Sequence, residues 1–196
     1  GSFAITDAKY ATYYHDFGYI MPTNVKGGVV MGANGESLNI DYKYAAGSVV
    51  PAKSALLLNG VSKTYEVALK LEEASEDAEN LLKGTSEDAT TTSDNADAKF
   101  YKLANDPQQG IGFYWADDNG NAFTNKAHCA YLALSGETAS AKAFVLDGSA
   151  TGIHGIVQVE ASQSEIYNLQ GMKVNASLEN LSKGLYIVNG KKVIVK

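Results

Sequence analysis

Hydrophobic and polar residues alternate along much of this chain, which is typical of strands with one buried face and one wet face. The alternation is strict over residues 37–43. The apolar face would carry Leu38, Ile40 and Tyr42, and the polar face Asn39, Asp41 and Lys43. The apolar segment 28–31 lies just before it, and Asn34-Gly35 stands between the two. This order predicts a β-hairpin.

Several other short segments are also typical of strands. Residues 54–58 form an apolar run closed by Asn59-Gly60, and a run that is apolar on both faces suggests a central strand. Residues 64–69 alternate again, with Tyr65, Val67 and Leu69 expected on one face. Further strands are predicted at 100–103, 111–115, 127–134 and 142–146. Turn residues recur about every ten residues, the spacing of a sandwich or barrel.

One acidic segment, residues 71–98, departs from this pattern. Within it, residues 72–82 have the composition of a short helix, and the rest reads as a polar, solvated loop. We therefore expect an all-β protein with little helix. The main domain, residues 1–150, should be an antiparallel β-sandwich of jelly-roll type. A small polar joint at 149–155 would lead to a C-terminal β module, residues 151–196.

Charge and composition narrow the possible partners. The chain has a net charge of −6, and its 16 lysines account for all of its Lys and Arg residues. Arginine is the preferred residue for phosphate and guanine, so an acidic chain without it is a poor nucleic-acid binder. No apolar run approaches the roughly 18 residues that span a bilayer. Cys129 is the only cysteine, so an intrachain disulfide is excluded.

The C-terminal tail carries the most informative pattern. Residues 165–174 read EIYNLQGMKV, and residues 183–196 read KGLYIVNGKKVIVK. Two short apolar strands meet at Asn189-Gly190, a strong signal for a two-residue hairpin. This tail resembles the C-terminal sorting module of exported Bacteroidetes proteins that use the type IX (Por) secretion route. The resemblance implies a secreted or outer-surface location and names no activity.

A second resemblance covers nearly all of residues 10–148. It is carried by an order of short motifs: YATYY at 10–14, Met21-Pro22, residues 49–60, NLLKGT at 80–85, GFYW at 112–115 and AHCAYL at 127–132. This order is similar to an uncharacterised β-rich domain that recurs in Bacteroidetes surface proteins. The likeness implies a fold class and a location, and it brings no activity with it.

The usual catalytic patterns are missing from the sequence. His15, His128 and His154 lie far apart in the chain, and His128 and Cys129 would point to opposite faces of a strand. The sequence holds no nucleophile elbow and no glycine-rich phosphate loop. The acidic residues lie mostly in loops rather than in the facing pair that a glycosidase needs. We expect no cofactor and no metal.

The segment 113–121 holds the best candidate binding residues. Asp117-Asp118-Asn119-Gly120 could supply oxygen ligands to calcium, but it is better explained as a tight turn with Asn119 and Gly120 at positive φ. Consecutive aromatic residues force at least one ring off the core face. Rings beside acids and amides suit sugars, because the ring stacks on C–H groups and the polar groups bind hydroxyls. The candidate site residues are Tyr114, Trp115, Asp117, Asp118, Tyr13 and Tyr14.

These observations favour a non-enzymatic interaction or adhesion domain of an exported or cell-surface protein. The alternative is a carbohydrate-binding module for polysaccharide capture, with Trp115 and Tyr114 as its platform. A glycoside hydrolase is a third, weaker hypothesis. The expected partner is a glycan or a host or cell-surface protein, and the pattern leaves the oligomeric state open.

Overall fold

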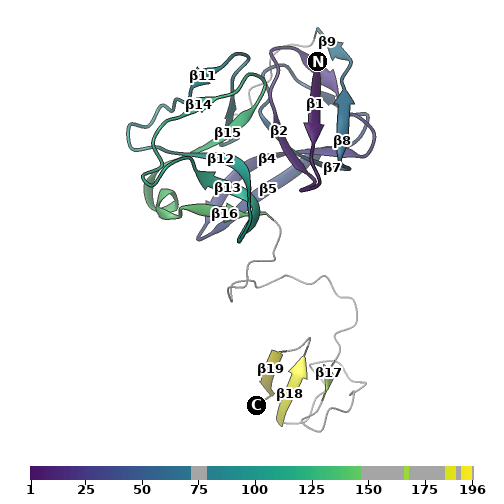
Figure 1. The fold of residues 1–196 in the computed structure, drawn as a ribbon. Coiled ribbons are helices and arrows are strands. Elements are labelled where there is room, and N and C mark those ends of the chain that lie inside the picture. The colour runs from purple at the N-terminus through teal and green to yellow at the C-terminus, as the bar shows by residue number, and fades with distance from the viewer. Residues whose placement is uncertain (72–78, 147–165, 168–183, 189–190, 196) are drawn as a thin grey trace. The chain divides into compact units, whose positions relative to one another are not determined.

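The computed structural model describes residues 1–71, 79–146, 166–167, 184–188 and 191–195 (Figure 1). Every described strand pairs antiparallel with its neighbours, in several small sheets, which confirms the predicted all-β, sandwich-like class. The chain divides into two compact units, Gly1–Thr151 and Gly152–Lys196. Within the described residues, none of the helical structure is long and apolar enough to cross a membrane.

A four-stranded sheet forms the central layer of the first unit. Its order is β2 (Tyr10–Tyr13), β7 (Leu56–Gly60), β4 (Val25–Asn34) and β5 (Ser37–Tyr44). Two smaller sheets share a core with one of its faces. They are β1 (Ser2–Ile5) with β8 (Lys63–Glu66), and β6 (Val49–Val50), β3 (Gly18–Ile20) and β9 (Leu69–Lys70).

A five-stranded sheet shares a second core with the other face of the central layer. Its order is β10 (Leu82–Gly84), β15 (Ala130–Leu134), β12 (Lys99–Asp106), β13 (Gly110–Trp115) and β16 (Ala143–Val145). A short ribbon of β11 (Ala89–Thr90) and β14 (Thr124–Asn125) and a 3₁₀ helix, Gly136–Ser140, complete the described part of the unit.

Strand β7 explains why residues 54–58 are apolar on both faces. Leu56 and Leu58 lie in the core shared with the small sheets, while Leu57 lies in the core shared with the five-stranded sheet. All of them are 0% exposed. Side chains of a strand alternate between faces, so a strand between two cores needs apolar residues at every position. The prediction of a central strand is confirmed.

The predicted hairpin is also confirmed. β4 pairs with β5 up to the Asn34↔Ser37 pair, and Gly35 turns the chain with φ +60°. The even-numbered residues of β5 are half-buried and the odd-numbered ones are exposed, as the alternation predicted.

Three predicted elements differ from the structure. Tyr65 and Val67 are buried as expected, but β8 ends at Glu66 and Leu69 belongs to β9, where it is 42% exposed. The chain changes sheets there, so one alternation spans two strands. The predicted strand 127–134 starts only at Ala130. Residues 72–78 of the expected helix lie outside the described residues, and 79–82 are not helical.

The second unit contains a three-stranded antiparallel sheet in the order β17 (Ile166–Tyr167), β18 (Gly184–Val188) and β19 (Lys191–Val195). Val188 pairs with Lys191, so the predicted hairpin joins β18 to β19. Asn189-Gly190 itself, and the joint predicted at 149–155, lie outside the described residues.

Candidate functional site

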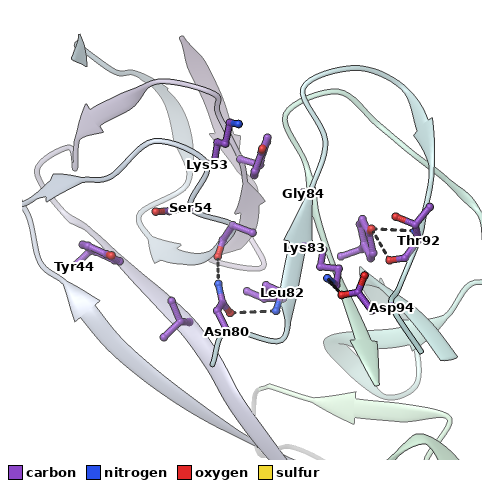
Figure 2. A pocket seen from close by; sticks show the side chains of 13 residues that line it. Tyr44, Lys53, Ser54, Asn80, Leu82, Lys83, Gly84, Thr92 and Asp94 are labelled. Carbon is purple, nitrogen blue, oxygen red and sulfur yellow. Dashed lines mark hydrogen bonds and ion pairs between the residues drawn. The ribbon is translucent and has the colours of Figure 1, made fainter. Parts of the chain in front are cut away.

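The first unit has a pocket of about 420 Å³, which we call the junction pocket, where β10 and its flanking loops meet the four-stranded sheet. Figure 2 shows Tyr44, Lys53 and Ser54 on one side and Thr92 and Asp94 on the other, with β10 between them. Its size lies within the roughly 300–1,000 Å³ of small-molecule sites. Its aromatic and polar lining residues are Tyr14, Tyr44, Lys53, Ser54, Asn80, Lys83, Thr92, Asp94 and Tyr131.

Asn80 holds the floor of the junction pocket together. Its Oδ1 accepts hydrogen bonds from the backbone N–H groups of Val30 and Leu82, each at 3.1 Å. Its Nδ2 donates to the carbonyl of Ala55 at 2.8 Å (Figure 2). One side chain therefore joins β4, the segment before β7 and β10. Asn80 is occupied by the fold and has little capacity left for a ligand.

The opposite wall, which carries Thr92 and Asp94 (Figure 2) and which we call the far wall, also has polar groups that pair with one another. The Tyr131 hydroxyl accepts from the N–H of Thr92 and donates to the carbonyl of Thr92, both at 3.0 Å. Lys83 Nζ lies 3.5 Å from Asp94 Oδ2, in a pair whose side chains are 41% and 99% exposed. So exposed an ion pair is weak and can exchange with a ligand.

The wall that carries Tyr44, Lys53 and Ser54 (Figure 2), which we call the near wall, offers groups that the described residues leave available. The Lys53 ammonium and the Ser54 hydroxyl have no partner among the described residues. Ser54 is only 8% exposed. Lys53 has φ +59°, an unusual conformation for a residue with a side chain. Its N–H donates to the carbonyl of His15 at 2.9 Å, which helps to hold this conformation.

Next to the pocket, the structure brings together two histidines that are far apart in the sequence. The rings of His15 and His128 stack with centroids 4.9 Å apart and planes 9° apart. His15 Nδ1 accepts the N–H of Phe17 at 3.0 Å. His128 Nδ1 lies 3.2 Å from the carbonyl of Tyr14, so this nitrogen carries the proton and donates it. Nothing in the sequence spacing pointed to this pair.

The histidine pair is not arranged for metal binding or for thiol chemistry. His15 uses the lone pair of Nδ1 for Phe17, and the described residues contain no cluster of three or more His, Cys, Asp or Glu side chains able to hold a metal. Burial lowers the pKa of His15, and His128 and the N-terminal amine act in the same direction against Asp16. Burial raises the pKa of Cys129, which disfavours a reactive thiolate.

The predicted tyrosines have different environments. Tyr13 is 1% exposed and lies in the core, away from any ligand surface. Tyr14 follows it on the opposite face, packs against Gly84 and lines the junction pocket. Tyr114 is half-buried, and its hydroxyl donates to the carbonyl of Gly110 at 2.8 Å along its own strand. Of these rings, Tyr14 alone lines the pocket.

Trp115 is packed rather than open. A Cβ at Gly120 would lie 2.8 Å from the indole, so the following turn rests on the ring. The ammonium groups of Lys99 and Lys142 lie 5.7 and 5.5 Å from the ring centre, and the Tyr101 ring is 6.2 Å away. The indole is half-buried against the second core. Its surroundings leave little surface for stacking a sugar.

Asp117 closes the turn that the sequence predicted. Its Oδ1 accepts the N–H groups of Asn119 and Asn121 at 2.9 and 3.0 Å, and its Oδ2 accepts the Asn121 amide at 2.8 Å. These bonds lower the pKa of Asp117. Gly120 has φ +65°, whereas Asn119, contrary to expectation, does not have a positive φ. Asp118 is exposed beside them, away from the junction pocket.

A second hollow of about 500 Å³ bears on the hydrolase hypothesis. It lies between the β4–β5 turn and the 3₁₀ helix, and its lining includes the carboxylates of Glu36 and Glu137. Both residues are exposed. A glycosidase needs burial to push the pKa values of its two acids apart, and this hollow does not provide it.

The junction pocket is therefore the best-formed candidate site, and of the residues predicted from the sequence it contains Tyr14. Comparisons with protein-family models, with curated proteins and with solved structures found no match for this chain.

Proposed function

We propose that residues 1–151 form a non-enzymatic binding domain of an exported or cell-surface protein, and that the junction pocket takes a saccharide. The observation that carries this proposal is the pocket's lining. The phenol rings of Tyr14 and Tyr44 stand beside the Lys53 ammonium and the Ser54 hydroxyl in about 420 Å³. Rings that cover C–H faces, with polar groups that bind hydroxyls, match the two surfaces of a sugar.

The same lining favours binding over hydrolysis. Among the described residues around the pocket, Asp94 is the one carboxylate, and its side chain is 99% exposed. Glycosidases place two carboxyl groups across the bond that they cleave. A single solvated acid can help to orient a sugar, but the described lining does not offer the pair that would protonate and displace the leaving group.

A glycan array with the full chain tests the proposal, followed by titration calorimetry on the hits. Tyr44→Ala should weaken binding at least about tenfold, which corresponds to about 1.4 kcal/mol. Tyr42→Ala is the matched control, because Tyr42 is another half-buried tyrosine of β5 and does not line the pocket. A blank array with folded protein, or equal losses in both variants, would contradict a saccharide site.

A protein ligand on the cell surface is the alternative partner for an adhesion domain. Pull-down with surface extracts separates it from a saccharide. Capture that survives enzymatic deglycosylation of the extract would favour protein recognition and would count against the pocket as the binding site.

For the second unit we propose a role in export. The hairpin of β18 and β19, with β17 on its edge, is a small antiparallel sheet of the kind that a sorting module presents. Fusing residues 152–196 to a reporter in a bacterium with a type IX system should place the reporter outside the cell. Equal export from a strain lacking that system would overturn the proposal.

A further inference from the structure

We infer that the saccharide taken by the junction pocket is acidic, with a carboxylate on its ring. This inference rests on the proposed function and specifies its ligand. It comes from the charges and hydrogen bonds of the pocket's described residues. The chain as a whole has a net charge of −6, yet the pocket is lined by Lys53 and Lys83 against one carboxylate, Asp94.

The hydrogen-bonding groups of the pocket favour an acidic sugar over a neutral one. A neutral sugar needs several donors and acceptors for its hydroxyls. The fold already uses the side chain of Asn80 and the hydroxyl of Tyr131. What the described residues leave unpaired on the near wall is one ammonium group, on Lys53, and the hydroxyls of Ser54 and Tyr44. An ammonium group makes its strongest hydrogen bonds to a carboxylate.

The backbone at Lys53 supports the same assignment. A residue with a side chain is strained at φ +59°, and such strain is found preferentially at functional sites. A glycine or asparagine would fit this backbone more easily. The strained position instead carries a lysine that lines the pocket and pairs with no acid in the described part of the chain.

Lys83 supplies a second cation that a ligand can recruit. Its bond to Asp94 is 3.5 Å long, and Asp94 is almost fully in solvent. Such a pair contributes little, so an incoming carboxylate can replace Asp94. After this exchange the ligand carboxylate balances the charge of Lys83, and the Asp94 carboxylate is solvated by water. Asp94 therefore competes with the ligand.

Calorimetry with a matched pair of probes tests the inference. Digalacturonate carries carboxylates, and α-1,4-galactobiose has the same ring stereochemistry without them. At low salt the full chain should bind digalacturonate about tenfold more tightly or better. Lys53→Gln should remove that preference and leave the weak binding of galactobiose unchanged. Lys102→Gln, at an exposed position of β12 outside the pocket, is the matched control.

Asp94→Asn gives a test with the opposite sign. It removes the competing charge at an almost fully exposed position, so the fold should be unaffected, and digalacturonate should bind about two- to fivefold more tightly. Equal affinity for the two probes would overturn the inference that the ligand is acidic, but the proposal of a saccharide pocket would stand. A glycan array on which only neutral sugars bind would have the same meaning. Binding of neither probe, with a blank array, would overturn the proposed function as well.

Discussion

Trp115 shows that sequence alone does not reveal how a single side chain is packed. Three consecutive aromatic residues do force rings onto both faces of β13, and Phe113 is 0% exposed on one of them. Tyr114 lies on the other face, whereas Trp115 shares the face of Phe113 and packs against the same core. The rest of the indole is not open, because the turn at Gly120 covers it and two lysines lie close to its ring. The turn comes only a few residues after β13. Its residue types are readable, but its direction is set by tertiary packing.

We therefore expect Trp115→Ala to destabilise the fold. Loss of a half-buried indole should lower the free energy of unfolding by about 2–3 kcal/mol, somewhat less than for a fully buried ring. The melting temperature should fall by several degrees. Phe17→Ala is the control: Phe17 is 47% exposed, so its loss should change stability by less than about 1 kcal/mol. An unchanged melting temperature with loss of sugar binding would restore the platform hypothesis.

Two buried tyrosines allow the contribution of a hydroxyl group to the free energy of unfolding to be measured. The Tyr19 hydroxyl is buried without a hydrogen-bond partner among the described residues, and burial raises its pKa. The Tyr101 hydroxyl lies 2.8 Å from the carbonyl of Ala141 and donates to it. Tyr101→Phe should lower the free energy of unfolding by about 1 kcal/mol. Tyr19→Phe should be neutral or stabilising, because it removes an unpaired polar group. Urea unfolding of both variants checks the contrast, and equal losses would contradict it.

The stacked histidines predict a loss of stability in acid. The pKa of His15 is below its ordinary 6.5 in the folded protein, so the unfolded chain binds more protons as pH falls through that value. This contribution to stability therefore rises with pH within the window, and it is lost as the pH is lowered through it. The charged groups that face His15 are His128, Asp16 and the N-terminal amine, and Asp16 alone opposes the shift.

Urea unfolding at pH 7.5 and pH 5.0 measures this effect. The wild type should lose more stability between the two values than His15→Gln does, because glutamine takes up no proton. Carboxylates that titrate near pH 5 contribute equally to both proteins and cancel in the comparison. An identical loss in the two proteins would show that His15 does not titrate differently on folding.

At the scale of the elements, the sequence is informative wherever a strand stays in one sheet. Strands β5 and β7 and the β4–β5 hairpin follow directly from period-two alternation, a double-sided apolar run and Asn34-Gly35. Prediction fails where the chain passes from one sheet to another, or where a residue other than glycine adopts a positive φ. The alternation of 64–69 is shared by β8 and β9, and His128 has φ +59° at a position where the sequence suggested a strand.

Two glycines of the β4–β5 hairpin separate backbone strain from crowding. A Cβ would meet nothing within 4 Å at either Gly32 or Gly35, and Gly35 alone has a positive φ, +60°. Gly35→Ala should therefore lower the free energy of unfolding by about 1 kcal/mol. Gly32→Ala should be neutral or slightly stabilising, because alanine restricts the unfolded chain. Chemical denaturation of both variants checks this, and similar values would show that φ does not decide the outcome.

At the scale of the whole molecule, the junction pocket could not be assembled from the sequence. Its walls come from the residue after β2, the segment before β7, strand β10 and the loop around Asp94. No periodicity relates these positions, and Asn80, which joins three of the segments, lay in a stretch interpreted as helix and loop. Tyr14 was found because two adjacent tyrosines on a strand must face opposite ways, a rule that holds regardless of the fold.

The division of the chain into two compact units predicts that the first unit is stable on its own. The three hydrophobic clusters of the described residues all consist of residues between Phe3 and Leu146, so residues 1–151 should fold without the second unit. Expressed alone, they should melt within about 2 °C of the full chain, since they contain every residue of these three clusters. Ending the chain at residue 140 is the matched control. It removes β16 and with it Phe144, which is 0% exposed and packs on Tyr101. Loss of such a ring costs about 3–5 kcal/mol, enough to unfold a domain of ordinary stability. If residues 1–151 unfold as readily as residues 1–140, the second unit contributes to the fold of the first.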